Sequence, residues 1–379
     1  CLTLEKLEMK KSLVALAALA FVGAASAQSS VMLYGVLDAD IAHFSQGGLG
    51  KTMLTSSGNS GSLLGFRGTE DLGGGLSANF WLESTLLNDT GSGLGGGLTF
   101  NRRSTVSLAS DFGEIRLGRD YTPSFINHYV FDPFLLSGPG AGSNITLGGG
   151  ANGVAGGNAA TAVRANNSIQ YLWGFNPNAI AAIGSGVYAQ LMYAFPENVS
   201  GMPALGQYTG GRLGYANGPV NAAISYAQSK GTPYAADVGQ GYSTYKELNL
   251  AGSYRFGVGQ LMAHAGTNNS DAAGTKYTHW GLGATINAGP GYIPIAFNSI
   301  KQNNVTSDGA NQIAVGYVYA LSKRTVLYGS VARIHNKNNG TYTFSGSNGG
   351  NNPGLQTAFG GGTSFGNGTG YGIGLRTSF

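Results

Sequence analysis

Cysteine is almost absent from this chain of 379 residues, because the single copy is Cys1. One cysteine cannot build a disulfide framework or supply the paired thiols of a structural metal site. Residues 1–8 precede Met9, which is a natural start residue, and we expect them to be a non-native upstream extension. Cys1 belongs to that extension, so the rest of the chain has no thiol chemistry.

Charged residues and long apolar runs are also scarce. Asp, Glu, Lys and Arg make up 10% of the chain, whereas glycine alone contributes 65 residues, a composition far from that of soluble domains. After Val22 no segment approaches the roughly 18 consecutive apolar residues of a membrane-spanning helix. The mean hydropathy is nevertheless close to zero. This combination is typical of a transmembrane β-barrel, where lipid-facing and water-facing residues alternate and cancel in the average.

The N-terminal region carries the pattern of an export signal. A basic segment, Met9–Lys11, precedes the apolar segment Leu13–Val22 and the small-residue cleavage pattern Ala25–Ala27. We therefore predict a signal peptide over residues 9–27 and an outer-membrane barrel over residues 28–379. Without residues 1–27 the formal charge is +3, since three lysines and two glutamates are removed. That charge is too small and too dispersed to indicate nucleic-acid binding.

Apolar and polar residues alternate with a period of two along the mature chain. In the first such segment Leu33 and Leu37 share one face, and Asp38 and Asp40 share the other. Five strand-like segments precede residue 120 and eleven follow residue 166, and residues 45–60 are expected to form a polar loop. Short turns alternate with longer loops. An even count of strands with this loop pattern predicts a sixteen-stranded antiparallel transmembrane barrel.

The longest connection, Asp120–Asn166, is rich in glycine and nearly free of charge. Asp132 is the only acid between Tyr121 and Val163, and apolar residues crowd the segment from Phe125 to Leu136. Long connections inside a compact fold are usually functional or disordered, and so many apolar side chains are unfavourable in water. We predict that this third loop folds into the barrel lumen and narrows a pore.

Charged side chains on the predicted inner face are the candidates for the pore constriction. Alternation directs Glu83 and Arg103 inward and Arg102 outward, but a bulge would reverse the two arginines, so both remain candidates. Arginine suits an anion path, because its charge does not titrate and its planar fork holds carboxylates or phosphates. The full candidate set is Arg67, Arg102, Arg103, Arg116 and Arg164 with Asp38, Glu83, Glu114, Asp120 and the loop residue Asp132.

Catalytic and metal-binding patterns are not found in the sequence. The five histidines are not spaced as metal ligands, and no glycine-rich segment precedes a helix in the manner of a phosphate-binding loop. We therefore expect no enzyme activity, no metal and no cofactor. The histidines are His43, His128, His264, His279 and His335.

Six sequence blocks are spread in order over nearly the whole mature chain: LYGVLDA (33–39), GFRGTEDLGGGL (65–76), FNRRSTVSLAS (100–110), FGEIRLGRDYTP (112–123), RANNSIQY (164–171) and LSKRTVLYG (321–329). Each block is weak alone, but in this order and at this spacing the chain resembles the general porins of Gram-negative outer membranes, of the type common in β-proteobacteria. The resemblance implies a sixteen-stranded barrel in outer-membrane lipid, a homotrimer, a third loop bent inside, and passive diffusion.

The family resemblance also implies roles for individual residues. It assigns Arg102 and Arg164 to the constriction, with Glu83 facing them. Relatives often carry a basic residue where this chain has Leu63, so we expect a weaker anion preference here. Relatives also often carry a histidine near the end of the final strand, where this chain has none. That strand instead ends in an apolar stripe that resembles the signal read by the outer-membrane assembly machinery, formed by Tyr371, Ile373, Leu375 and the terminal Phe379.

Together these features predict a water-filled outer-membrane channel for ions and small hydrophilic solutes that prefers anions. A substrate-selective channel of similar size is one alternative, since the aromatic residues between Phe125 and Phe134 resemble a lumenal aromatic track. A secreted or surface β-rich adhesin is a second alternative. Such a protein should repeat at a fixed period, and the sequence shows no such period.

Overall fold

The computed structural model describes residues 30–93, 96–146, 163–175, 183–198, 200, 204–231, 243–271, 275–303, 306–344 and 366–379. The predicted upstream extension and signal peptide lie outside these residues. Two short helices occur, α2 (Pro123–Val130) and α3 (Ser143–Thr146), and no helix of the described residues is long and apolar enough to cross a membrane. The strands are β1 (Ser30–Gln46), β2 (Leu49–Ser56), β3 (Leu63–Gly73), β4 (Leu76–Leu87), β5 (Ser92–Gly93), β6 (Arg103–Ser110), β7 (Gly113–Tyr121), β8 (Arg164–Trp173), β9 (Gly186–Ala194), β10 (Tyr208–Asn217), β11 (Val220–Gly231), β12 (Ser243–Phe256), β13 (Gly259–Ser270), β14 (Thr275–Ala288), β15 (Gly291–Gln302), β16 (Gly309–Ala320), β17 (Thr325–Lys337) and β18 (Gly368–Ser378).

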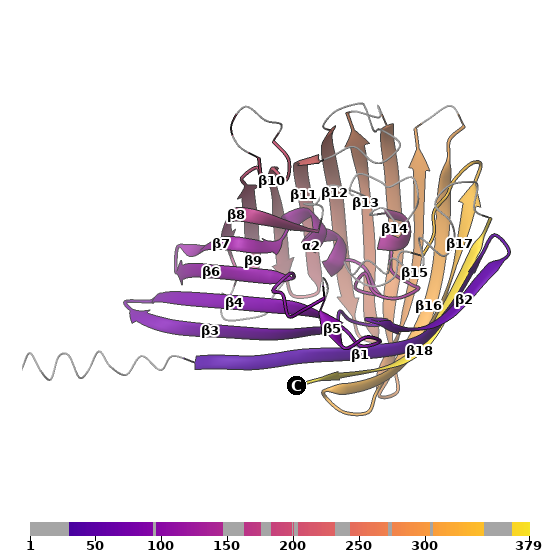
Figure 1. Ribbon diagram of the computed structural model, residues 1–379, viewed down its shortest axis with the longest axis horizontal. Helices are drawn as coiled ribbons and strands as arrows, with labels where there is room; N and C mark the ends of the chain where they lie inside the picture. Colours follow the sequence, from indigo (N-terminus) through magenta and orange to yellow (C-terminus); the bar gives the residue numbers. More distant parts are fainter. Residues whose placement is uncertain are drawn as a thin grey trace, which may run out of the picture.

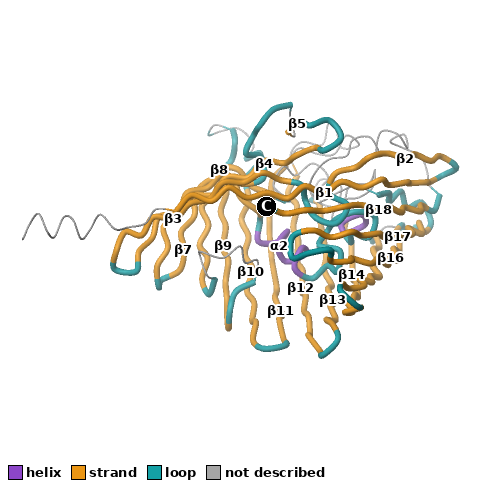
Figure 2. The backbone as a smooth tube through the Cα atoms, turned by 90° about the horizontal axis from the view of Figure 1, so that it is seen from below, coloured by secondary structure: helices purple, strands orange, loops and turns teal. Residues whose placement is uncertain are grey.

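The strands form one antiparallel sheet that closes on itself (Figure 1). Closure comes from pairing of β1 with β18, and Gly35 and Phe379 exchange two backbone hydrogen bonds of 3.1 Å beside it. Both β2 and β3 pair with β1 and lie at its opposite ends (Figure 2), so together they fill one position in the barrel. The two-residue β5 pairs with β4 alone. The protein is therefore a closed barrel of sixteen antiparallel strands, which confirms the predicted fold class.

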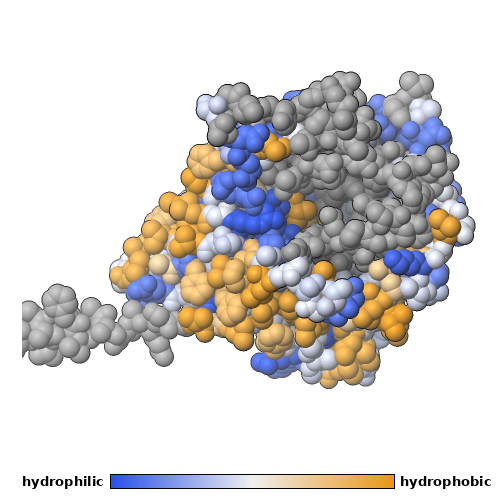
Figure 3. All heavy atoms as spheres, viewed as in Figure 1, coloured by the Kyte–Doolittle hydropathy of each residue, from blue (hydrophilic) through white to orange (hydrophobic). Residues whose placement is uncertain are grey.

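The two faces of the sheet differ in the way that the alternation predicts. On β12, Leu248 and Leu250 are exposed, whereas Asn249 between them is fully buried. Apolar residues accordingly gather on the described outer surface over β1, β3 and β4 (Figure 3). Closure pairs the backbone groups of neighbouring strands and leaves no open edge, which is what a β-structure in lipid requires. The apolar outer face can therefore contact lipid directly.

The expected polar loop over residues 45–60 is wrong, because most of it is strand. The first strand continues to Gln46, turns at Gly47 and Gly48, and returns as β2 along β1. Both glycines have positive φ, 60° and 84°, a conformation that glycine adopts without steric cost and that tight hairpins require. The Gly-Gly pair was the hairpin signal, and the polar composition around it masked the strand. Residues 57–62 remain as a short irregular segment between β2 and β3.

The described part of the long connection begins with a capped helix. The Thr122 hydroxyl accepts from the Phe125 backbone N–H at 3.3 Å, and Pro123 occupies the start of α2, where no backbone donor is needed. Helix α2 packs against β9, β10, β11 and β12, and α3 packs against β15 and β16. Residues 147–162 of this loop lie outside the described residues.

Side chains of the barrel wall hold the described part of the loop through hydrogen bonds. Asn127 Nδ2 donates to Asn249 Oδ1 at 2.5 Å, Asn268 Nδ2 donates to the Thr146 carbonyl at 3.2 Å, and Gln312 Nε2 donates to the Ala141 carbonyl at 3.0 Å. The wall residues in these bonds are buried and lie on the face opposite the exposed apolar side chains. Residues 122–146 therefore run along the inner side of the wall.

Candidate pore site

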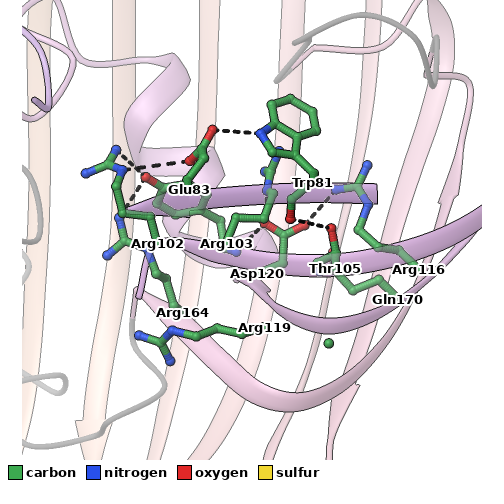
Figure 4. Close-up of polar contacts among 12 residues, drawn as sticks. Trp81, Glu83, Arg102, Arg103, Thr105, Arg116, Arg119, Asp120, Arg164 and Gln170 are labelled. Carbon is green, nitrogen blue, oxygen red and sulfur yellow. Dashed lines mark hydrogen bonds and ion pairs between the residues drawn. The ribbon is translucent and has the colours of Figure 1, made fainter. Parts of the chain in front are cut away.

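Most of the predicted arginines and carboxylates gather on the inner side of the wall at β4, β6, β7 and β8 (Figure 4). Strand pairing explains this grouping, because Glu83 of β4 lies opposite Arg103 of β6, and Arg116 of β7 lies opposite Gln170 of β8. Residues opposite each other in neighbouring strands project to the same side. Segments that are far apart in sequence are thus placed on one patch of wall.

Part of this patch is a compact ion-pair network centred on Asp120. Arg103 Nε lies 2.6 Å from Asp120 Oδ1, and Arg116 Nη1 lies 2.6 Å from Asp120 Oδ2. Arg116 also makes a two-pronged contact with Glu114, with N–O distances of 2.9 and 3.0 Å. Two arginines and two carboxylates therefore compensate each other here. The Arg103 guanidinium also stacks on Trp81, 4.0 Å from the ring centre.

Arg102 and Arg164 are held differently, because they share a neutral partner. The Nη2 atoms of both arginines donate to the hydroxyl of Tyr121 at 2.7 Å. The Arg164 guanidinium carbon lies 4.3 Å from the centre of the same ring. Of the two, Arg102 has a carboxylate close by, Glu83, at 3.7 Å. Tyr121 satisfies donors of both arginines without adding a negative charge, and Glu83 offsets part of the charge of Arg102 only.

Arg67 completes the set of predicted arginines. It lies on β3 beside Met32 of β1, and its guanidinium carbon is 5.8 Å from the centre of the Trp81 ring. With these residues and Arg116 it lines an open cavity of about 300 Å³ on the inner wall. The patch therefore contains five arginines and three carboxylates: Arg67, Arg102, Arg103, Arg116 and Arg164 against Glu83, Glu114 and Asp120.

Both arginines of the Arg102–Arg103 doublet project to the inner side. Arg103 is the first residue of β6 and follows the alternation that buries Thr105 and Ser107. Arg102 precedes the strand, so alternation does not govern its direction, and the question left open by the sequence is resolved with both arginines on the inner side. Its side chain is buried against Glu83 and Tyr121.

Asp38 is not brought into contact with the arginines. Its carboxylate accepts from the backbone N–H groups of Asn59 and Ser60, at 2.9 and 2.5 Å, and from the hydroxyl of Tyr328. It thereby holds the irregular segment 57–62. That segment lies against the arginine patch, since a Cβ added at Gly61 would be 3.0 Å from Arg102 Nη1. Asp38 is thus placed to support the wall next to Arg102.

Asp132 is also buried, and its carboxylate is hydrogen-bonded within its own loop. Its two carboxylate oxygens accept from the backbone N–H groups of Phe134 and Gly142, each at 2.7 Å. Burial raises the pKa of Asp132 to about 6. The carboxylate therefore ties together the chain between α2 and α3, away from the arginine patch.

Two important side chains were not among the predicted site residues. Tyr121 ends β7 directly after Asp120, and its role as a shared acceptor depends on Arg164, which is far away in sequence. Trp81 lies on the same face of β4 as Glu83, and its indole Nε1 donates to Glu83 Oε1 at 2.9 Å and also contacts the hydroxyl of Tyr34. Alternation indicates the side of an aromatic residue but not its partners.

The C-terminal residues lie where the predicted stripe requires. Tyr371, Ile373 and Leu375 are exposed on the outer face of β18, and the Phe379 ring is half exposed. The ring lies against Gly35, where a Cβ would overlap it.

Within the described residues, no group of three or more His, Cys, Asp or Glu side chains is arranged to hold a metal ion.

A family profile described as Gram-negative porin matches residues 13–339 of the chain. Outer membrane porin protein 32 of Delftia acidovorans is 40% identical over 344 residues, which cover 88% of this chain and 92% of that protein. An outer membrane porin protein of Bordetella pertussis is 31% identical over 389 residues, covering 86% of this chain and 94% of that protein.

Solved structures show the same architecture. The anion-selective porin from Comamonas acidovorans superposes with a TM-score of 0.76 at 34% identity, covering 93% of this chain and 100% of that chain. The trimer form of OmpT, an outer membrane protein of Vibrio cholerae, superposes with a TM-score of 0.64 at 13% identity, covering 93% of this chain and 99% of that chain. The second likeness concerns the fold alone.

Proposed function

Because the chain belongs to the Gram-negative porin family, and is therefore an outer-membrane diffusion channel, we propose that its pore prefers anions and that Arg102 and Arg164 set this preference. One observation carries the proposal: five arginines face three carboxylates on a single inner patch, and the acid of the described loop, Asp132, is buried away from it. The relative from Comamonas acidovorans is an anion-selective porin, and this supports the same direction.

Local charge matters more than net charge in a narrow channel. Low-dielectric walls focus the field of the patch and raise the local concentration of counter-ions. Arg103 and Arg116 contribute little to this field, because Asp120 and Glu114 lie within 3.0 Å of them. Arg102 and Arg164 share a neutral acceptor instead, and Glu83 lies farther away, 3.7 Å from Arg102, so more of their charge acts on a passing anion.

The loop supplies the opposite side of the proposed constriction. Residues 122–146 follow the inner side of β9–β16, whereas the arginine patch lies on β3–β8. We propose that solutes pass between the two and that the loop narrows the pore there. The loop is held by hydrogen bonds from neutral side chains of the wall. The arginines therefore supply the charge on the opposite side of the proposed passage.

Further features of the family are proposed for this chain as well. The trimeric form of a structural relative and the exposed apolar outer face support a homotrimer in outer-membrane lipid. The exposed stripe of β18 that ends at Phe379 supports recognition by the assembly machinery. We infer no catalytic function, since the relatives are porins. Residues 9–27 are proposed to direct export.

The test is the zero-current potential of the purified channel in a planar bilayer across a KCl gradient. The wild type should prefer chloride in dilute salt, and the preference should shrink in concentrated salt, since the Debye length falls from about 10 Å at 0.1 M to about 3 Å at 1 M. Arg102→Gln combined with Arg164→Gln should move the potential toward potassium. A wild-type channel that prefers potassium in dilute salt would overturn the proposal.

A matched control removes two positive charges elsewhere. Lys230 lies at the end of β11, and Lys323 lies in the exposed turn before β17, so Lys230→Gln with Lys323→Gln changes net charge equally and should leave the potential nearly unchanged. An equal shift in both double variants would show that net charge, and not the arginine patch, sets the preference.

A further inference from the structure

Three of the five histidines, which are far apart in sequence, meet where α2 lies against the barrel wall. His128 comes from α2, His264 from β13 and His279 from β14. Their ring centres are 6.2 Å apart for His128 and His264, 5.4 Å for His128 and His279, and 5.8 Å for His264 and His279. The folded barrel thus creates a cluster of imidazoles between the loop and the wall.

The cluster is buried and only partly hydrogen-bonded. His128 Nε2 lies 2.6 Å from Glu247 Oε1, and His264 Nε2 lies 3.0 Å from Asn298 Oδ1. Both ring nitrogens of His279 and the Nδ1 atom of His264 are buried without a hydrogen-bond partner among the described residues, and His279 is fully buried. A buried charge is strongly unfavourable unless it is paired, so this arrangement suits neutral rings at His264 and His279.

The charged and titratable neighbours cannot offset protonation of these two rings. Glu247 is the nearest carboxylate, and it is already in contact with His128. Asp132 is held by backbone donors, and its pKa, raised to about 6 by burial, means that it loses its charge in the same acidic range. The other buried or partly buried titratable side chains near the cluster include Tyr129 on the helix, Tyr188 on β9, Arg212 and Tyr208 on β10, Tyr245 on β12 and Tyr277 on β14.

We propose that His128, His264 and His279 form a proton-operated latch that holds α2 against the wall at neutral pH and releases it in acid. In acid, protonation of more than one of the three rings places like charges 5.4 to 6.2 Å apart in a buried site. This repulsion weakens the contact between the loop and the wall, so α2 moves into the lumen and the current falls.

This inference rests on the proposed position of the loop in the pore but not on ion selectivity. The test is single-channel recording in 1 M KCl, where selectivity effects are screened, with the pH of both sides lowered from 7.5 to 4.5. The wild type should lose about half of its mean current through closures as histidine becomes protonated. His264→Asn with His279→Asn should keep nearly constant current over the same range.

A second variant covers the case in which the double substitution prevents folding. His128→Gln changes only the loop side, keeps a hydrogen-bond donor for Glu247 and adds no proton, so its acid closure should be at least about threefold less frequent than in the wild type. His335→Gln, at an exposed position on β17, is the matched control and should close as the wild type does. Unchanged acid closure in the cluster variants, or a wild type without acid closure, would overturn the latch.

The failure of the latch and the failure of the proposed anion preference can be told apart. A channel that prefers chloride at pH 7.5 but shows no closure in acid lacks the latch and retains the proposed function. A channel that prefers potassium at pH 7.5 but closes in acid through these histidines contradicts the proposed function and retains the latch.

Discussion

The surroundings of each arginine, more than its position on the inner face, decide what it contributes to the pore. Arg103 and Arg116 share Asp120, so their charge is compensated within hydrogen-bonding distance. Arg102 and Arg164 share the hydroxyl of Tyr121. A neutral acceptor orients a guanidinium without cancelling its charge. Residues of the same type on the same wall are therefore expected to differ in their effect on a permeating ion.

At this scale Tyr121→Phe is the most informative single substitution. It removes one acceptor from two buried arginines and leaves ring packing intact, and an unsatisfied buried donor costs about 1–3 kcal/mol. We expect a lower urea midpoint of unfolding and a noisier open-channel current, because both guanidiniums gain freedom.

Tyr129→Phe removes a hydroxyl group from α2 that is not the shared acceptor of the two guanidiniums, and it serves as the control. Equal losses of stability in the two variants would contradict the role assigned to the Tyr121 hydroxyl.

At the scale of elements, the loop is positioned by single polar contacts with successive strands. Asn249 on β12, Asn268 on β13 and Gln312 on β16 each bind a different part of residues 122–146. Asp38 does the same for the irregular segment 57–62, which lies against Arg102. Both sides of the proposed constriction thus depend on buried polar side chains of the wall. These side chains hold loop segments whose backbone does not pair with a neighbouring strand.

Gln312→Leu should loosen one of these anchors. Gln312 Nε2 donates to the carbonyls of Pro139 and Ala141, at 3.3 and 3.0 Å, and leucine offers no donor at similar size. We expect a barrel that still folds, with current fluctuations several times larger than in the wild type, measured in single-channel recordings.

Gln260→Leu, at the far end of β13 next to the turn, is the control for loss of an amide. Quiet recordings from Gln312→Leu would show that these two hydrogen bonds do not restrain the loop.

At the scale of the whole molecule, the barrel depends on the meeting of its two ends. Pairing of β1 with β18 runs from Val36 to Gln46, and Phe379 extends it with two backbone hydrogen bonds to Gly35. The Phe379 ring also covers Gly35, where a side chain would not fit. The last residue therefore contributes to closure in addition to its proposed role as an assembly signal.

Phe379→Ala should lower the amount of folded, heat-modifiable protein in the outer membrane severalfold without blocking export to the periplasm. Quantitative blotting of heated and unheated membrane samples measures the effect.

Phe195→Ala, which removes another half-exposed outer aromatic next to β9, is the matched control and should assemble nearly normally. Normal assembly of Phe379→Ala would contradict the assembly role.

The sequence by itself determined the barrel, its closure and the side of the wall on which most charges lie. Alternation with a period of two can be read from a short stretch of sequence, and residues that face lipid must be apolar. The sequence therefore predicts that Leu248 and Leu250 face outward and that Asn249 faces inward, as the structure has them. The sixteen strands follow from the same signal. The hairpin return from Gly47 to Ser56 was missed, because a polar strand at the rim lacks the apolar face that marks the barrel-spanning strands.

Tertiary structure alone decided which side chains meet. The shared acceptor Tyr121, the contact of Asp38 with Tyr328, and the cluster of His128, His264 and His279 all join residues that are far apart in the sequence. These contacts depend on strand register and on where the loop lies against the wall, since a shift of one residue turns every side chain to the other face. The direction of Arg102 could not be predicted from alternation, because this residue lies one position before its strand begins. Its contacts with Glu83 and Tyr121 set its direction instead.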